Sequence, residues 1–185
     1  MHFAPDTEVL LVFNVALANT VATASRSGSD ELATTDQLLA LVSEHGFTGR
    51  FDRDTGELAQ VRAARSELRR IWVLDRDAMV GEVNALLRDT RTLPQLARHD
   101  GFDWHLHATG TDAPLADRIL AEAAIALVDV IRSTATDRLR VCEADDCEGL
   151  FTDLSRNGSR RYCSVRCGNR MNMIAHRRRQ GGESD

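Results

Sequence analysis

Four cysteine residues in the last quarter of the chain place the strongest constraint on its fold. Cys142 and Cys147 form one pair, and Cys163 and Cys167 form a second pair farther along the chain. Two such pairs separated by a short gap are typical of chains that hold one tetrahedral Zn²⁺ between two backbone turns. Two disulfides, or four unrelated thiols, are the alternatives. We expect one structural zinc ion, because four thiolates leave no open position for catalysis at the metal.

The residues around the second pair predict the local fold of this module. Asn157-Gly158 is a strong turn signal, and it predicts a hairpin between Leu150–Asp153 and Arg160–Cys163. Ser164 is a good capping residue for a helix that carries Cys167 in its first turn, where the helix dipole favours a thiolate. A turn, a hairpin and a helix around one zinc ion make a treble-clef-like arrangement.

Charge is distributed unevenly between the two parts of the chain. The net charge is −5, and all 23 basic residues are arginine. Residues 1–137 carry a net charge of −8, whereas residues 138–185 carry +3. The segment 154–180 contains eight arginines and no acidic residue. A basic block beside an acidic body indicates contact with a polyanion.

The final predicted helix concentrates this positive charge. On an ideal helix Arg166, Arg170 and Arg177 lie within about 40° of one another, with Asn169 beside them. Arginine pairs bidentately with phosphate or guanine, and asparagine with adenine, although a solvated arginine face is the alternative. The residues that we expect to contact nucleic acid are Arg160, Arg161, Arg166, Asn169, Arg170, Arg177, Arg178 and Arg179.

The aromatic content of the module favours DNA over RNA. Phe151 and Tyr162 are its only aromatic residues, and we expect them to form its small core. Single-stranded RNA is usually bound by aromatic side chains that stack on bases. DNA is therefore the expected partner.

The segment before the cysteines reads as a mostly helical body. Thr34 and Gln37 have the spacing of a capping box, Asp54 is a second helix start, and Pro114 precedes the longest predicted helix. Residues 103–108 alternate apolar and polar side chains, which predicts one short strand. The fold class is therefore mainly α with a small β component, with a helical domain over residues 1–137 and a zinc module over residues 138–185.

Other candidate sites are weaker. His105 and His107 would share one face of the short strand, as a metal or anion site or as exposed histidines. His176 invites comparison with treble-clef nucleases, but the module offers it no obvious partner for a catalytic metal. Asp145 and Asp146 read as a solvated loop. Phosphate-binding glycine loops and nucleophile elbows are missing, so we expect no catalytic residues and no enzyme.

The amino-terminal apolar run does not have the features of a secretion signal. Residues 9–18 are preceded by Asp6 and Glu8 rather than by basic residues, and no run is long enough to span a membrane. Thiolate ligands need a reducing compartment, so we expect a cytoplasmic protein with no membrane partner.

The zinc module resembles a known family. The segment from Phe151 to Arg170 contains the literal sequence Cys167-Gly168-Asn169-Arg170 and is similar to the CGNR zinc finger over residues 138–180. The body resembles the ABATE domain that precedes this finger in bacterial proteins, with Asn19-Thr20 matching an Asn-Thr motif near its amino terminus. The acidic residue that the family has before this motif is replaced by Leu17-Ala18. The resemblance implies a stress-induced transcriptional regulator.

Two hypotheses for function follow. In the first, the chain is a zinc-dependent DNA-binding regulator whose body forms a homodimer or senses a signal, with no effector indicated by the sequence. In the second, zinc only stabilises a protein-interaction adaptor that binds no nucleic acid, and the basic helix docks on an acidic partner or on the body.

Overall fold

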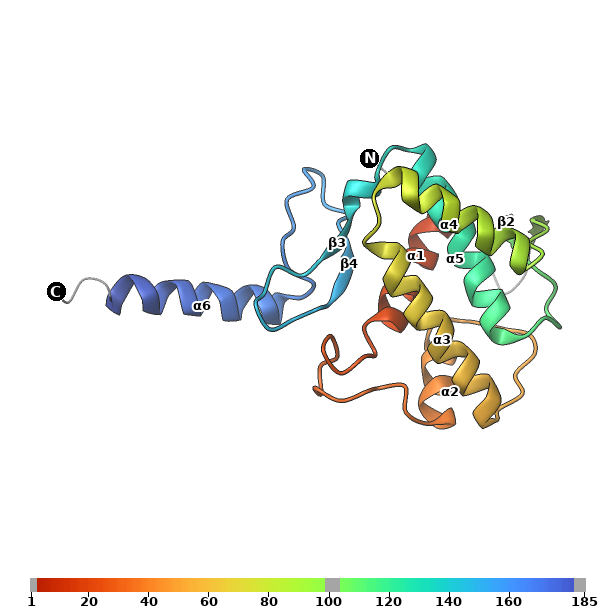
Figure 1. Cartoon of the computed structure of the whole chain (residues 1–185), viewed down its shortest axis with the longest axis horizontal. Coiled ribbons are helices and arrows are strands. Elements are labelled where there is room, and N and C mark those ends of the chain that lie inside the picture. Colours follow the sequence, from red (N-terminus) through yellow and green to blue (C-terminus); the bar gives the residue numbers. More distant parts are fainter. Residues whose placement is uncertain (1–2, 99–103, 182–185) are drawn as a thin grey trace.

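The computed structural model describes residues 3–98 and 104–181, which form a helical body and a carboxy-terminal segment that we call the finger (Figure 1). The helices of the body are α1 (Pro5–Ala18), α2 (Thr35–Glu44), α3 (Thr55–Trp72), α4 (Arg76–Asp89) and α5 (Leu115–Arg132). Between α4 and α5, the short antiparallel pair comprises β1 (Gln95–Ala97) and β2 (His105–His107). After the 3-10 turn η1 (Thr136–Arg138), the finger comprises β3 (Leu139–Val141), β4 (Leu150–Thr152) and α6 (Val165–Gly181). This architecture confirms the predicted fold class.

The helix starts that were predicted from capping residues are present. The Thr34 side chain accepts a hydrogen bond from the backbone N–H of Gln37, and the side-chain oxygen of Gln37 accepts one from the backbone N–H of Thr34. Asp54 caps α3 in the same way, through the N–H of Glu57. Each cap satisfies backbone donors that have no partner within the helix. The capping residues therefore predicted these two helix starts correctly.

Helix α5 is the centre of the body, and α1, α3 and α4 pack around it (Figure 1). Four of its alanines, at positions 121, 123, 124 and 126, have no exposed surface. Small side chains on several sides of one helix allow neighbouring helices to approach closely, and their burial removes apolar surface from water. The alanine content of α5 therefore explains why this helix is central.

The core of the body has two parts. One part lies between α1, α3, α4 and α5 and includes Leu11, Ile71, Met79 and Leu127. The other lies between α1, α2, α3 and α5 and includes Phe13, Leu38, Val61, Leu68 and Ile119. Two residues of the finger, Leu139 and Leu150, belong to the first part. The strands of the finger are therefore packed into the core of the body.

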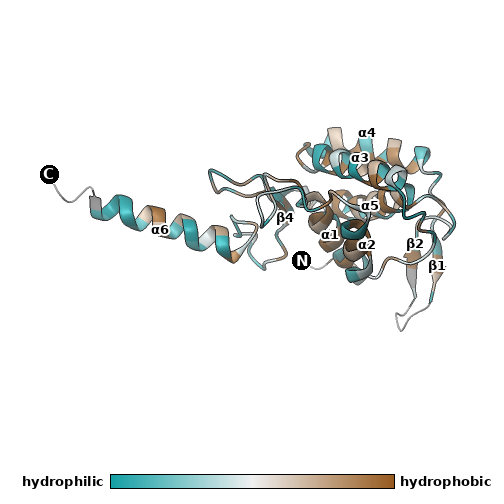
Figure 2. Ribbon diagram, turned by 90° about the horizontal axis from the view of Figure 1, so that it is seen from below, coloured by the Kyte–Doolittle hydropathy of each residue, from teal (hydrophilic) through white to brown (hydrophobic). Residues whose placement is uncertain are grey.

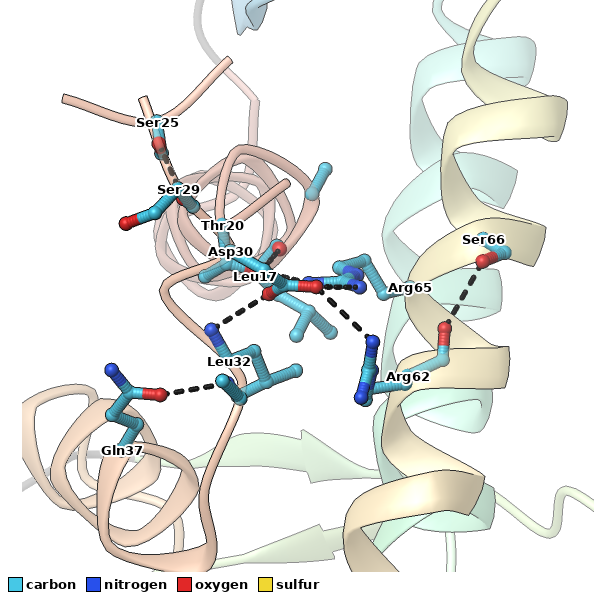
Figure 3. Close-up of polar contacts among 12 residues, drawn as sticks. Leu17, Thr20, Ser25, Ser29, Asp30, Leu32, Gln37, Arg62, Arg65 and Ser66 are labelled. Atoms are coloured by element: carbon cyan, nitrogen blue, oxygen red, sulfur yellow. Dashed lines mark hydrogen bonds and ion pairs between the residues drawn. The ribbon is translucent and has the colours of Figure 1, made fainter. Parts of the chain in front are cut away.

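The loop between α1 and α2 is held against α3 by a charged network (Figure 3). Arg65, of which only 5% is exposed, donates to both carboxylate oxygens of Asp30 at 2.7 and 2.9 Å, and also to the hydroxyl of Thr20. The hydrogen bond from Arg65 lowers the pKa of Asp30 to about 2, despite the opposing effect of burial. This loop also contacts the finger. The network therefore helps to position the residues of the body that the finger contacts.

The structure differs from the sequence prediction in the position of the hairpin. The strands of the finger are β3 and β4, which flank the first cysteine pair, whereas the segment 153–164 forms no strand. Gly158 has a positive φ of 59°, as a turn requires, but the turn does not join two paired strands. The prediction was wrong because it took residues 160–163 as the partner of β4. Asp153 instead binds that segment with its side chain, by accepting the N–H of Arg160.

The short strand of the body was predicted in nearly the right place. Strand β2 falls within the expected range 103–108, of which Asp103 lies outside the described residues. Its partner β1 was not expected, because three residues are too few to show an alternation. Within the described residues, no helix combines the length and apolar character that are needed to cross a membrane.

Candidate metal centre and basic helix

The four cysteines meet at one point of the finger. Cys142 follows β3, Cys147 lies in the turn before β4, Cys163 precedes α6, and Cys167 lies in its first turn. Their sulfur atoms all lie within 4.8 Å of one another, and each cysteine is a free thiol. The two cysteine pairs therefore supply one compact set of sulfur ligands.

The spacing of the sulfurs fits a tetrahedral zinc ion. The Sγ atom of Cys163 lies 3.7 Å from that of Cys147 and 3.7 Å from that of Cys167. Four thiolates that each lie about 2.3 Å from Zn²⁺ are separated by about 3.8 Å at the corners of a tetrahedron. A disulfide needs sulfur atoms about 2.05 Å apart. The geometry thus supports one structural zinc ion, and the disulfide alternative is not what the structure shows.

Backbone groups and one glycine shape the site around the sulfurs. The N–H groups of Gly149 and Cys163 point at the sulfurs of Cys147 and Cys142, each at 3.4 Å. A Cβ atom at Gly149 would lie 2.8 Å from the Cys163 sulfur, so only glycine fits there. Burial raises the pKa of the Cys163 thiol, with contributions from the neighbouring sulfurs. A bound dication favours the thiolate forms that such burial opposes.

The start of α6 follows the prediction. The hydroxyl of Ser164 accepts the backbone N–H of Cys167 at 3.2 Å, which is the expected cap. Tyr162 and Met171 pack beside the cysteines in a small cluster, and Phe151 is buried nearby at 2% exposed. Phe151 therefore lies in the packed interior, and Tyr162 is partly buried beside the cysteines.

The finger is joined to the body by specific hydrogen bonds. The side-chain amide of Asn19 donates to the carbonyl oxygen of Leu150 at 2.8 Å and accepts the N–H of the same residue at 2.7 Å. Arg69 bridges the carbonyl oxygens of Ala18 and Glu148. Asn19 belongs to the Asn-Thr motif that was noted in the sequence. The structure thus shows this asparagine binding the edge of β4, a role that sequence reasoning missed.

Helix α6 extends away from the body, and its far half lies beside no other element in either view (Figures 1 and 2). It contains no acidic residue and is mostly hydrophilic along its length. Arg177, Arg178 and Arg179 are exposed, and their side chains have no hydrogen-bond or ion-pair partner in the described part of the chain. The side chain of Asn169 is also exposed and unbonded there. These four side chains can pair with an external group.

The other four predicted residues have partners within the chain. Arg160 donates to the carbonyl oxygens of Tyr162 and Cys163 and lies over the ring of Phe151. Arg161 pairs with Glu143 at 2.6 Å. These two arginines stabilise the segment between the cysteine pairs. Their position in an arginine-rich part of the sequence did not predict this role.

Arg166 and Arg170 lie at the root of α6. Arg166 donates to the backbone oxygen of Arg26 at 2.9 Å, which ties the helix to the loop before α2. Arg170 pairs with Asp146 at 2.5 Å, and its guanidinium also approaches the Cys167 sulfur at 3.7 Å. Asp146 therefore does more than form a solvated loop. Sequence reasoning did not anticipate that the backbone of Arg26 would contact α6.

The histidine pair of β2 is only partly described. The side chain of His105 lies outside the described residues. The Nδ1 atom of His107 lies 3.7 Å from a carboxylate oxygen of Glu122 on α5. Among the described residues, the four cysteines are the set whose ligand atoms cluster as a metal site requires.

Comparison with known families agrees with the fold and the metal site. The CGNR zinc finger matches residues 138–180. The ABATE family, described as a putative stress-induced transcription regulator, matches residues 13–134, which is more than half of the chain. No curated protein matches the chain. Neither of the two families is described as a type of enzyme. The chain therefore belongs to the ABATE family and carries a CGNR zinc finger.

Proposed function

We propose that this chain is a zinc-dependent transcription regulator that binds duplex DNA in the cytoplasm through α6. The observation that carries the proposal is the free, basic outer half of this helix. Its three consecutive arginines, 177–179, are exposed and unpaired within the described residues. An α-helix of this kind fits the major groove, and arginines neutralise phosphates with release of counterions.

The zinc ion has an organising role in this proposal. It joins the root of α6 to the turn that precedes β4, and β4 is bonded to the body through Asn19. The direction of the helix is therefore set before DNA is bound, so binding does not have to order it. The four thiolates supply structure and leave the contacts with nucleic acid to the arginines.

The contacts divide into two groups. Arg177, Arg178 and Arg179 are the main phosphate contacts, and Asn169 is the one residue of the set that is suited to reading a base edge. Arg160, Arg161, Arg166 and Arg170 act chiefly by holding the finger in shape, since their guanidinium groups already have partners.

The test is fluorescence anisotropy of the zinc-loaded full chain with a pool of duplex DNA at several salt concentrations. Replacement of Arg178 and Arg179 by alanine should weaken binding roughly tenfold and reduce the slope of log K against log salt by about 2. The matched control replaces Arg88 and Arg132, which are also exposed and also lie in the last turns of their helices. The control variant should retain at least half of the affinity, because its charges lie on the body.

Two results would contradict the proposal. Equal losses in the two variants would mean that net charge, rather than α6, governs binding. Absence of binding by the unmodified chain at low salt would favour the adaptor hypothesis, in which the same exposed arginines meet an acidic protein.

A further inference from the structure

The body contains a cavity that plays no part in zinc or DNA binding. It lies between α1, the segment 45–48, β2 and α5, and it has a volume of about 630 Å³. Pockets for small organic molecules typically range from about 300 to 1,000 Å³. The cavity is therefore large enough for a small molecule, and it lies in the part of the chain that carries no nucleic-acid contacts.

Large apolar side chains border the cavity and are poorly covered. Val9 of α1 is 53% exposed and Trp104, just before β2, is 64% exposed. Leu106 and Phe47 also line the cavity, and Leu106 is 37% exposed. Single exposed apolar residues are common, but several that converge on one hollow indicate a surface that a ligand covers. These walls favour a ligand with an apolar chain or ring.

One charged residue in the cavity lining is almost fully buried. Arg118 of α5 is 6% exposed, and no carboxylate in the described part of the chain lies within ion-pair distance of it. Its guanidinium donates to the carbonyl oxygens of Thr48, Arg50 and Ala113. These three bonds use three of the five N–H groups of an arginine, so two remain. Burial lowers the pKa of Arg118, and Glu57 and Glu122 oppose this shift from beyond ion-pair distance. A ligand carboxylate could accept the two remaining N–H groups directly.

Two carboxylates, Asp6 and Glu122, also line the cavity. Glu122 lies one helical turn from Arg118, and it accepts the backbone N–H of Ala108 while facing His107. Asp6 accepts the N–H of Thr7 at the start of α1. Both carboxylates accept a backbone N–H, whereas two N–H groups of Arg118 have no acceptor in the described part of the chain.

We propose that the cavity binds a small organic carboxylate, with the acid group on Arg118 and the apolar part against Val9, Phe47, Trp104 and Leu106. The assignment does not depend on DNA binding, because none of these residues belongs to the finger. The proposal names a class of ligand for the body, which the sequence hypothesis described only as sensing a signal.

Intrinsic fluorescence offers a direct test with the zinc-loaded full chain. Of the two tryptophans, Trp72 is buried at 3% exposed, so a change in emission reports mainly on Trp104. The probes are 4-phenylbutyrate, its neutral amide and 4-phenylbutylamine, which share one apolar part. The acid should shift the emission to the blue and bind roughly tenfold more tightly than the amide, because charge-assisted hydrogen bonds are the stronger ones. The Trp104→Phe variant should lose the signal but retain binding measured by calorimetry.

A matched pair of variants locates the site without disturbing Arg118. Val9→Glu places a negative charge on the wall of the cavity and should reduce affinity for the acid at least tenfold. Val12→Glu changes an equally exposed residue of the same helix, 52% exposed, that does not line the cavity, so it should leave affinity unchanged. Circular dichroism checks that both variants fold.

Three outcomes would overturn the assignment. Equal affinity for the acid and the amide would show that Arg118 does not recognise the head group. Tighter binding of the amine would assign recognition to the carboxylates instead. Absence of binding by all three probes at millimolar concentration would mean that the cavity does not accept this class. None of these outcomes bears on whether α6 binds DNA.

Discussion

At the scale of single residues, Gly149 shows how closely the backbone approaches the metal site. A Cβ atom there would lie 2.8 Å from the Cys163 sulfur and 3.2 Å from the Cys147 sulfur. A sulfur bound to a metal cannot move away without distorting the tetrahedron. The position needs glycine because a side chain would not fit. The backbone conformation does not require glycine, since the φ of Gly149 is not positive.

This contact predicts the effect of one added methyl group. Gly149→Ala should lower zinc affinity by about tenfold or more, which competition with a colorimetric chelator would measure. The control is Gly81→Ala in α4, where a Cβ atom meets nothing within 4 Å. It should stabilise the chain by about 0.5–1 kcal/mol through helix propensity and leave zinc affinity unchanged. Unchanged affinity in Gly149→Ala would show that the turn between Cys147 and β4 relaxes around the methyl group.

At the scale of elements, the contact between α1 and β4 depends on one side chain. Asn19, immediately after α1, pairs with both backbone polar groups of Leu150 much as a neighbouring strand would. It thereby satisfies an edge of β4 that would otherwise lack a partner. The asparagine of the Asn-Thr motif is thus explained by the junction between body and finger.

Asn19→Ala should therefore destabilise the zinc-loaded chain by about 2 kcal/mol, because two partly buried backbone groups lose their partners. Urea unfolding followed by circular dichroism would measure the change. Asn169→Ala removes an exposed, unbonded amide and should stay within about 0.5 kcal/mol of the unmodified chain. Equal effects of the two substitutions would mean that water replaces Asn19 at β4.

Elements that begin with local signals were predicted well from the sequence, and those that depend on distant partners were not. The caps at Thr34, Asp54 and Ser164 act within one helical turn, so the chain carries their full pattern. The pairing of β3 with β4 depends instead on how the first cysteine turn closes. Similarly, four cysteines at suitable spacing indicated the metal, whereas the partners of Arg166 and Arg170 depend on tertiary contacts.

At the scale of the whole molecule, the boundary predicted at residues 137 and 138 does not separate two independent cores. Leu139 and Leu150 of the finger pack in the same core as Leu11 and Ile71 of the body. The shared core gives a physical reason for coupling between the two parts.

Removal of zinc should therefore do more than unfold the finger. Chelation should release α6 from its root and lower the melting temperature of the remaining helices by about 5 °C, because apolar contacts of the hairpin are lost. Thermal unfolding with and without a chelator would measure this shift. A Cys142→Ser variant should have the lower melting temperature even without the chelator. Adding the chelator should then change its melting temperature less than that of the unmodified chain. An unshifted body transition would mean that β3 and β4 stay in place without the metal.

The root of α6 is fixed by Arg166 on the loop before α2 and by Arg170 on Asp146, while its outer half is free. A helix of 17 residues is about 25 Å long. Such a rod acts as a lever, and a tilt of about 5° at the root moves its tip by about 2 Å. That displacement approaches the spacing between successive base pairs in DNA, about 3.4 Å. Small shifts in the loop that carries Arg26 would thus be magnified at the arginines of the tip.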